Sequence, residues 1–329
     1  MNTELTAKLE SIVSKDLKID EPMSGHSHYK IGGPAKYFAT AQTSEEVVEL
    51  VRTAIVHEID WVIVGAGTNI LVSDAGFTGL VIKMANRSIQ INEESGEVVA
   101  EAGALSAMVA RETSKLGLTG FEWAVGLPGT IGGAVRGNAG CFGGEAKDSL
   151  ESIDIVDGET GELSSIPAKK LKMGYRESEV KRKPWIVLRA HFMLEKRDAE
   201  RNLEKLEDVL QCRAASQPKN ARCAGCAYKN FEFSDVSDID KLVEAIGIDN
   251  IPPNFINNKR IPAGWVIDQA GLKGFKVGGA SISDVHGNFV INGEGATADH
   301  IVQLLAAVKT KVRNLYGVQL EEEIQLIGF

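Results

Sequence analysis

The stretch that decides the fold of the first half of the chain, residues 60–84, reads DWVIVGAGTNILVSDAGFTGLVIKM. An apolar run leads into Gly65, Ala66, Gly67, Thr68 and Asn69, and two glycines after such a run often indicate a dinucleotide-binding turn. That turn also requires a third glycine and an immediate helix, whose N-terminus holds the pyrophosphate. Here Ile70 occupies the third glycine position, and residues 70–84 alternate and turn like two more strands. We therefore predict a loop between strands rather than a Rossmann unit.

The bare backbone of this loop has two interpretations. Its N–H groups are suited to cradling phosphate as an anion nest. A tight turn that needs glycine for its dihedral angles is an equally good explanation of this stretch taken alone.

A second glycine-rich stretch, GLPGTIGGAVRGNAGCFGGE at residues 126–145, contains eight glycines. Leu127, Ile131, Val135 and Phe142 are spaced through it, so it is not a low-complexity segment. Glycines among apolar residues indicate backbone that a ligand or another segment approaches closely. Two such loops favour an extended cofactor that carries phosphate, and a glycine-rich packing corner is the structural alternative.

Composition limits the classes of partner. The chain has 329 residues, 43% of them hydrophobic, which is enough for one large domain or two smaller ones. A net charge of -9 and a pI near 5.3 argue against binding to nucleic acid or to an anionic membrane. Charges occur throughout residues 1–20, so we expect neither a signal peptide nor a membrane span, and we expect a cytoplasmic protein.

The four cysteines, Cys141, Cys212, Cys223 and Cys226, are too few for a disulfide scaffold in a chain of this length. A structural zinc site needs a second pair beside CAGC, residues 223–226, and Cys141 and Cys212 do not form one. We predict no metal, and we expect Cys141 and Cys212 to be small buried thiols.

Regular elements are predicted in several places. Thr43 and Glu46 form a capping box before a helix that extends to about residue 59, and a last helix begins at Thr297 and ends at Gly317. Residues 149–166 read as a hairpin and residues 184–194 as a strand. The charged segment 195–215 is predicted to be a helix that connects domains, and the chain is predicted to end on a strand.

Seven motifs in order carry a family resemblance: YKIGGPAKYF at 29–38, VGAGTNILVSD at 64–74, the glycine-rich stretch at 126–145, GYRES at 174–178, CAGCAYKN at 223–230, AGWVIDQAGLKGFKVGGASIS at 263–283 and YGVQLEEEIQLIG at 316–328. Together they resemble the UDP-N-acetylenolpyruvoylglucosamine reductases, the flavoenzymes that complete UDP-N-acetylmuramate for the bacterial cell wall. The resemblance extends from about residue 28 to the C-terminus.

The resemblance implies an α+β fold. An FAD-binding domain of the vanillyl-alcohol-oxidase (PCMH) type would span residues 29–197, after an N-terminal helical segment at 1–28, and an α+β substrate-binding domain would span 198–329. Residues 65–69 would wrap the FAD pyrophosphate through backbone N–H groups. A second set would line the other side of FAD: Pro128, Gly129, Thr130, Gly133, Asn138 and Gly140.

The reaction implied by the resemblance is reduction of an enolpyruvyl double bond by hydride from NADPH, relayed through flavin N5. Arg176 matches the family's arginine and suits the substrate carboxylate, because a guanidinium is always charged and forked. Its alternative role is an ion pair with Glu177 or Glu179. Cys226 occupies the proton-donor position, where many members carry serine. Glu323 is the family's acid in the last strand, although alternation alone puts Glu321 and Glu323 on the same face.

Further residues carry over as substrate-binding candidates: Tyr175, Lys229, Asn230, Arg213 and His286. The expected partners are a UDP-sugar and NADPH, with no nucleic acid and no membrane, and we expect a monomer or weak dimer. The chain departs from the family pattern in lacking a proline after Asn230 and in the short spacing between Arg176 and Cys226. A disulfide between Cys223 and Cys226 that silences the donor is a further hypothesis. A flavin oxidase and a non-catalytic nucleotide-sugar or flavin binder remain as alternative functions.

Overall fold

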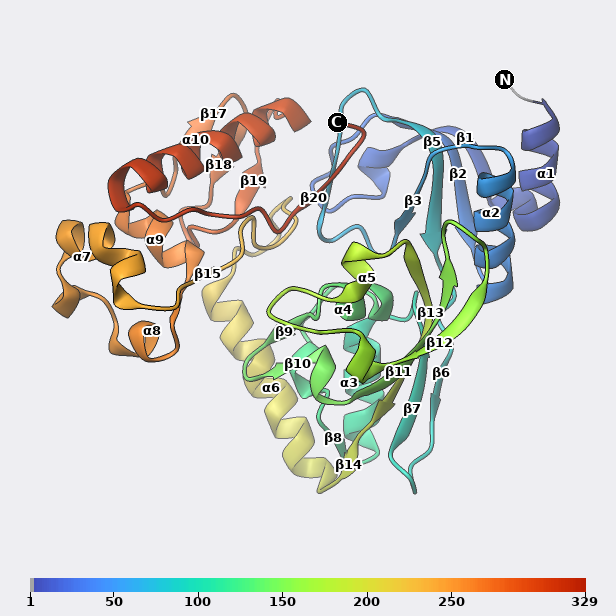
Figure 1. Cartoon of the computed structure of the whole chain (residues 1–329), viewed down its shortest axis with the longest axis horizontal. Coiled ribbons are helices and arrows are strands. Elements are labelled where there is room, and N and C mark those ends of the chain that lie inside the picture. The colour runs from blue at the N-terminus through green and yellow to red at the C-terminus, as the bar shows by residue number, and fades with distance from the viewer. Residues whose placement is uncertain (1–2) are drawn as a thin grey trace. The chain divides into compact units, whose positions relative to one another are not determined.

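The computed structural model describes residues 3–329 and divides into two compact units, whose elements are labelled in Figure 1. Unit 1 comprises the chain up to Glu21 together with residues 35–67 and 77–215, and unit 2 comprises residues 22–34, 68–76 and 216–329. These bounds differ from the predicted domains at 29–197 and 198–329. The predicted bounds are continuous in sequence, whereas unit 2 recruits two short segments from the first half of the chain.

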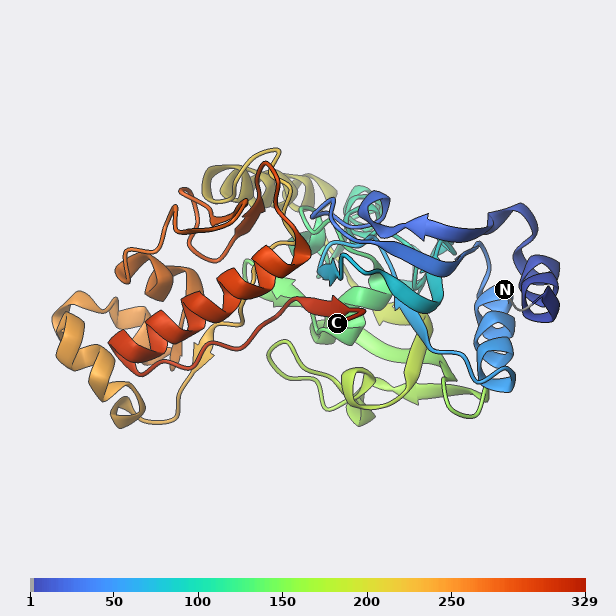
Figure 2. The same cartoon turned by 90° about the horizontal axis from the view of Figure 1, so that it is seen from above.

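The first layer of unit 1 is a four-stranded sheet in the order β1-β2-β5-β3, in which β2 and β3 both run parallel to β5. The strands are β1 (Leu17–Pro22), β2 (Pro34–Ala41), β3 (Trp61–Val64) and β5 (Phe77–Met84). Helices α1 (Thr3–Val13) and α2 (Ser44–Val56) lie together beside this sheet, as Figure 2 shows. Thr43 and Glu46 form the predicted capping box of α2.

The second layer of unit 1 is an antiparallel five-stranded sheet in the order β12-β11-β13-β7-β6. Its strands are β6 (Ile89–Ile91), β7 (Glu97–Glu101), β11 (Leu150–Asp157), β12 (Leu163–Pro167) and β13 (Trp185–Met193), so the predicted hairpin and strand are confirmed. Its buried face contributes Ala100, Ile153 and Ala190 to the same core as Leu5, Leu9 and Val47. Alternate residues such as Asp154, Arg189 and His191 face away from that core.

The remaining elements of unit 1 are short, apart from two helices. They are α3 (Ser106–Lys115), β8 (Leu118–Thr119), α4 (Ile131–Arg136), β9 (Gly140–Cys141), β10 (Gly144–Glu145), α5 (Glu179–Arg182), β14 (Glu195–Lys196) and α6 (Ala199–Ser216). The predicted connector helix is thus α6, which belongs to unit 1 almost entirely. Cys212 is exposed on α6, so the expectation of a buried thiol there is wrong, whereas Cys141 is partly buried.

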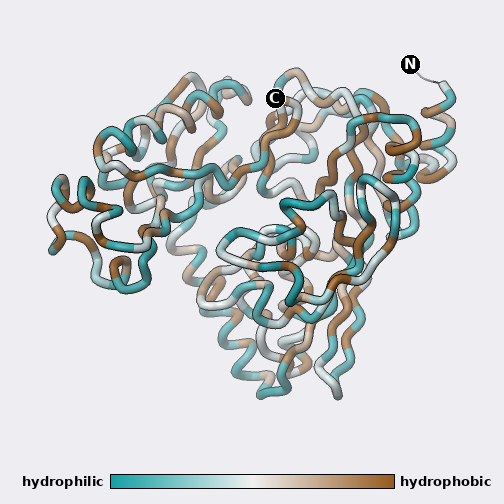
Figure 3. Tube along the Cα trace, in the orientation of Figure 1, coloured by the Kyte–Doolittle hydropathy of each residue, from teal (hydrophilic) through white to brown (hydrophobic). Residues whose placement is uncertain are grey.

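Unit 2 is built around α10 (Ala298–Tyr316), which begins after Thr297 and ends at Gly317 as predicted. Hydrophobic and hydrophilic residues alternate along its trace in Figure 3, and the apolar ones, such as Ile301, Leu305 and Val308, enter the second core. The other elements are β4 (Ile70–Val72), β15 (Phe231–Glu232), α7 (Asp240–Ile246), α8 (Pro253–Asn257), β16 (Arg260–Ile261), α9 (Ala263–Gln269), β17 (Lys276–Val277), β18 (Ala280–Ile282), β19 (Val290–Asn292) and β20 (Gln325–Ile327).

Two pairings bring distant segments of unit 2 together. β17, β18 and β19 form an antiparallel sheet, and β20 pairs in parallel with β4. The predicted last strand is therefore short, and Glu323 lies just before β20 rather than within it. The predicted order around residue 65 is confirmed, because a loop joins β3 to β4 and β5 follows.

Candidate active site

The two glycine-rich loops meet within unit 1. A Cβ atom placed on Gly65 would lie 2.5 Å from the Oγ1 atom of Thr130, which itself is buried at the start of α4. Gly67 has a φ angle of 70°, which favours glycine. The loop backbone at 65–67 thus lies directly against the second glycine cluster. The predicted loop continues into unit 2 at Thr68 and Asn69, where the side chain of Asn69 donates to the Glu323 carbonyl at 3.1 Å.

The glycines of residues 126–145 fall into two groups. Gly126, Gly140 and Gly144 are packed against protein, because an added Cβ would lie 2.2 Å from Arg213, 2.5 Å from Glu145 and 2.5 Å from Trp123, respectively. Gly133 is different, since its nearest neighbour would be Thr130 Oγ1 at 3.6 Å, an ordinary contact distance. The packing interpretation therefore explains part of the cluster, including Gly140 and Gly132, and does not explain Gly133 or Gly143.

Asn138 is one of the predicted cofactor-binding residues, but its side chain is committed to the protein. The residue is fully buried with a φ angle of 40°. Its amide nitrogen donates to Glu145 at 2.6 Å and to the Gly174 carbonyl at 2.8 Å, and its oxygen accepts from the Lys147 N–H at 3.0 Å. Asn138 thus ties the glycine cluster to the turn that carries Arg176.

Arg176 lies in a tight turn closed by reciprocal backbone hydrogen bonds between Gly174 and Glu177. Its φ angle is 55°, a conformation that costs energy in a residue with a side chain and that concentrates at functional sites. Its Nη2 donates to the Gly140 carbonyl at 3.0 Å, and its guanidinium lies 5.5 Å from the centre of the Tyr175 ring.

The acids that an alternative interpretation pairs with Arg176 contact other bases. Glu177 pairs with Lys181 and Arg182, and Glu179 also pairs with Arg182. Arg213, the other arginine predicted to bind substrate, packs against Gly126 and lies over the Phe142 ring at 5.8 Å. Unit 1 therefore gathers Arg176, Tyr175 and Arg213 around the 126–145 cluster.

In unit 2 the motif at residues 223–230 pairs with the segment before β20. The Glu323 N–H donates to the Ala227 carbonyl at 2.8 Å, and the Lys229 N–H donates to the Glu321 carbonyl at 2.8 Å. Cys226 and Glu323 thus lie on neighbouring segments, although the sequence separates them widely. Cys226 itself forms an antiparallel bridge with Phe289, and Gly225 before it has a φ angle of 73°.

The other predicted residues of unit 2 surround this pairing. Lys229 Nζ lies 3.3 Å from the carboxylate of Glu321, which is 72% exposed. The side-chain oxygen of Asn230 accepts from the Ala263 N–H at the start of α9. The Nδ1 atom of His286 accepts from the Asn288 N–H at 3.1 Å, and burial lowers the pKa of His286, as does the positive charge of Lys273. The His286 ring is therefore held neutral with its proton on Nε2.

Asn288 was not anticipated from the sequence. It is buried, and its side chain bonds both the N–H and the carbonyl of Tyr228. A polar residue between a glycine and an apolar strand usually indicates a turn, so no local signal distinguishes it.

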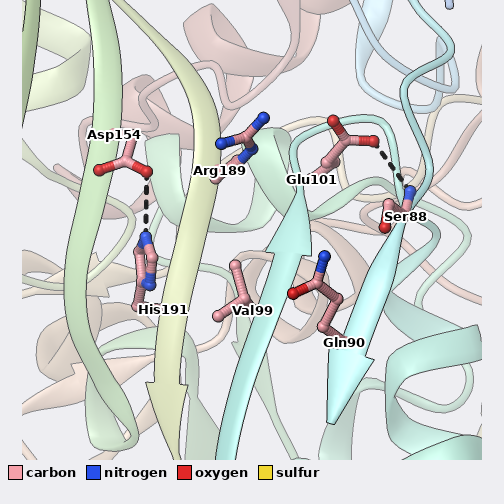
Figure 4. A pocket seen from close by; sticks show the side chains of 7 residues that line it. All are labelled: Ser88, Gln90, Val99, Glu101, Asp154, Arg189 and His191. Carbon is pink, nitrogen blue, oxygen red and sulfur yellow. Dashed lines mark hydrogen bonds and ion pairs between the residues drawn. The ribbon is translucent and has the colours of Figure 1, made fainter. Parts of the chain in front are cut away.

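A cavity of about 340 Å³ lies elsewhere in unit 1, on the polar face of the five-stranded sheet (Figure 4). Figure 4 shows Asp154 hydrogen-bonded to His191 and Glu101 to the Ser88 N–H. Arg189 lies 3.7 Å from Glu45. The charged groups that line the cavity thus have partners within the protein. None of the predicted site residues lines the cavity.

Two general features bear on ligands and location. Among residues 3–329, no three or more His, Cys, Asp or Glu side chains converge so that they could hold a metal ion. None of the helices in that range combines the length and the hydrophobicity required to cross a bilayer.

Comparison with known proteins assigns each half of the chain to a protein family. Residues 35–166 match the FAD binding domain family, and residues 217–327 match the C-terminal domain of UDP-N-acetylenolpyruvoylglucosamine reductase. The expected α+β fold, with a PCMH-type FAD-binding domain, is confirmed. The protein is therefore a flavin-binding oxidoreductase.

Full-length relatives define the family. The chain is 35% identical over its whole length to a UDP-N-acetylenolpyruvoylglucosamine reductase of Lachnoclostridium phytofermentans, covering 98% of that protein. It is 32% identical to the enzyme of that name from Clostridioides difficile, with 99% of each chain covered. The crystal structure of the Thermus caldophilus reductase superimposes with a TM-score of 0.72 at 30% identity, covering 94% of this chain and 98% of that one. The chain belongs to the UDP-N-acetylenolpyruvoylglucosamine reductase family.

The residues present are compatible with FAD. Family membership supports FAD as the cofactor with NADPH as co-substrate. Residues 65–69 and 128–133 contain no acidic side chain that would repel a pyrophosphate, and a Cβ atom on Gly133 would meet only an ordinary contact.

Proposed function

We propose that this chain reduces the enolpyruvyl group of UDP-N-acetylglucosamine enolpyruvate to give UDP-N-acetylmuramate, a peptidoglycan precursor, in the cytoplasm. In this proposal the reaction serves cell-wall biogenesis, and through it cell shape and division. The observation that supports it best is the pairing of residues 227–229 with 321–323, which brings the candidate proton donor and the candidate acid onto neighbouring segments. When bound, FAD would pass to the substrate the hydride that NADPH provides. The protein must then stabilise negative charge and deliver a proton.

Arg176 is the group that we propose to hold the substrate carboxylate. As hydride reaches the terminal carbon of the double bond, negative charge develops on the carbon that bears the carboxylate and spreads onto the carboxylate, where a positioned cation stabilises it. The left-handed backbone fixes where the Arg176 side chain starts, and the hydrogen bond to the Gly140 carbonyl fixes its guanidinium end. This preorganisation means that little reorientation is needed during the reaction.

Cys226 is the proposed proton donor to the carbanion-like carbon. Thiols titrate near pH 8.5 in short peptides, so a thiol stays mostly protonated at neutral pH and is more acidic than the serine hydroxyl of many relatives. Glu323 is proposed as the second acidic group beside that carbon. The Glu323 N–H bonds to the carbonyl of Ala227, the residue that follows Cys226, and this bond supports the role.

The remaining candidates are proposed to bind the rest of the substrates. Lys229 and Asn230 would contact a diphosphate or the nicotinamide cofactor, and Tyr175 the UDP-sugar. Arg213 and His286 are proposed as further substrate contacts. The proposed flavin contacts are the backbone of residues 65–69 and the set Pro128, Gly129, Thr130, Gly133, Asn138 and Gly140, with Asn138 contributing through its main chain because its side chain is occupied.

An anaerobic visible spectrum tests the proposal one half-reaction at a time. NADPH should bleach the bound flavin, and the enolpyruvyl sugar should restore its colour. Recovery of colour only in air would indicate an oxidase, and failure to bind FAD would contradict the assignment of the glycine loops. Cys226→Ala should still be bleached by NADPH but should not be reoxidised by the substrate. Cys212→Ala is the matched control, because it removes an exposed thiol on α6.

A further inference from the structure

The Asn288 side chain continues a short antiparallel pairing along the segment that carries Cys226, in which Cys226 bridges Phe289 and the Ala227 N–H donates to the Asn288 carbonyl. Its side-chain oxygen accepts from the Tyr228 N–H at 2.9 Å, and its side-chain nitrogen donates to the Tyr228 carbonyl at 2.8 Å. Two residues of an antiparallel ladder exchange the same pair of bonds. The amide orientation is fixed by the backbone, since the Tyr228 N–H only donates and its carbonyl only accepts.

The other edge of the same segment is held by the chain before β20. Lys229 and Ala227 bond there to Glu321 and Glu323. In such a ladder the N–H and carbonyl of the intervening Tyr228 point away from the 321–323 segment. Asn288 therefore supplies both partners for backbone groups that the neighbouring segment cannot reach.

Burial makes this contact consequential. Asn288 is 2% exposed and Tyr228 is 1% exposed. The Asn288 carbonyl also accepts from the Ala227 N–H at 2.8 Å, and the Tyr228 hydroxyl donates to the Leu305 carbonyl on α10. Water cannot easily replace a lost partner at such a position, so removing the amide leaves buried backbone groups unpaired.

Resting on the proposed function, we propose that Asn288 is a positioning residue: its amide holds residues 226–230 in register with residues 321–323, and so sets Cys226 and Lys229 relative to Glu323. Asn288 itself does not touch the substrate in this proposal. It acts on the step in which substrate reoxidises the flavin, since Cys226 and Glu323 serve that step.

Asn288→Asp is the most informative variant because it has nearly the same shape. A protonated Asp carboxyl has one donor and one acceptor and reproduces both bonds to Tyr228, whereas an ionised carboxylate cannot donate to the carbonyl. The ionisable groups around this position are His286 and Asp284 on the same turn, Cys226, Tyr228 and Lys229 on the held segment, Glu321, Glu322 and Glu323 across it, and Asp268 and Lys273 near His286. They titrate in wild type too, so the ratio of variant to wild type isolates position 288.

We expect the flavin of Asn288→Asp to be bleached by NADPH at the wild-type rate. Its reoxidation by the enolpyruvyl sugar should be slowed at least tenfold at pH 8 and should approach the wild-type rate near pH 5.5. Asn292→Asp is the matched control, because Asn292 is also in unit 2 and its side chain donates to the Tyr29 carbonyl rather than to the backbone of residues 226–230. Equal reoxidation by Asn288→Asp and wild type at every pH, or an equal loss in Asn292→Asp, would overturn the proposal.

Hydrogen exchange gives a readout independent of turnover. The peptide covering residues 226–230 should exchange at least tenfold faster in Asn288→Asp than in wild type at pH 8, and at the wild-type rate in Asn292→Asp. Unchanged protection would refute the positioning role. A wild-type protein that the enolpyruvyl sugar does not reoxidise would instead refute the proposed function, and with it the role of Asn288 in that step.

Discussion

Replacing Gly65 by alanine tests whether the two glycine loops are packed against each other as the structure has them. The new Cβ would lie 2.5 Å from Thr130 Oγ1 and 3.2 Å from its Cγ2. Thr130 is only 5% exposed, so it has little room to move aside. Overpacking of this kind costs about 1–3 kcal/mol of unfolding free energy. In a domain of this size the melting temperature should fall by roughly 2–12 °C.

The second substitution in the test is Thr130→Ala, which removes both clashing atoms and leaves only the Thr130 Cβ, at 3.4 Å from the alanine Cβ. Thr130 makes no side-chain capping bond to α4, so its truncation should itself be mild. The double variant should therefore regain most of the stability that Gly65→Ala loses, and a double-mutant cycle measures this coupling. Circular dichroism melts of the four proteins, with and without added FAD, supply the data.

Gly133→Ala separates packing from cofactor contact. Its Cβ has ordinary space and α4 gains helix propensity, so the melting temperature without FAD should not fall. The dissociation constant for FAD should nevertheless rise at least tenfold if the cofactor lies against this backbone. A wild-type melting temperature for Gly65→Ala, or a lack of rescue by Thr130→Ala, would refute the packing argument. Unchanged FAD affinity in Gly133→Ala would refute the cofactor contact.

Three further outcomes are expected. Arg176→Lys should slow flavin reoxidation by substrate about 10²-fold or more, because lysine lacks the planar fork that binds a carboxylate. Its melting temperature should be unchanged, and rapid-mixing absorbance measures the rate. The free energy of unfolding should fall as pH drops from 7 through about 6.5, because the lowered pKa of His286 means that the unfolded chain binds more protons there than the folded chain does. In His286→Gln, urea unfolding should show a smaller dependence of this free energy on pH. An unchanged dependence would exclude His286 as the cause. Mild peroxide, which takes two electrons and two protons from Cys223 and Cys226 and becomes water, should inactivate the protein until dithiothreitol restores it. Because dithiothreitol also reduces a sulfenic acid on Cys226, the deciding measurement is the mass of the 223–226 peptide before reduction: a disulfide makes it two hydrogens lighter in wild type and not in Cys223→Ser, and an unbridged wild-type peptide would rule out the disulfide.

The sequence determined the local structure around residue 65 and the ends of the main helices. Ile70 in place of a glycine and the alternation after it excluded a helix, and strands β4 and β5 follow there. Capping signals at Thr43 and Thr297 fixed the starts of α2 and α10. These features are short-range, because capping, turn geometry and side-chain periodicity depend on residues a few positions apart.

Only the tertiary structure decided which residues share a neighbourhood. Gly140 and Gly133 look alike in sequence, yet a Cβ atom on Gly140 would lie 2.5 Å from Glu145, whereas one on Gly133 would meet only an ordinary contact at 3.6 Å. The division of the chain into discontinuous units and the pairing of residues 227–229 with 321–323 depend on contacts between distant segments. Asn288 shows the reason most directly. An asparagine between a glycine and a strand indicates a turn in the sequence, and its side chain pairs with the Tyr228 backbone only because folding buries the two residues side by side.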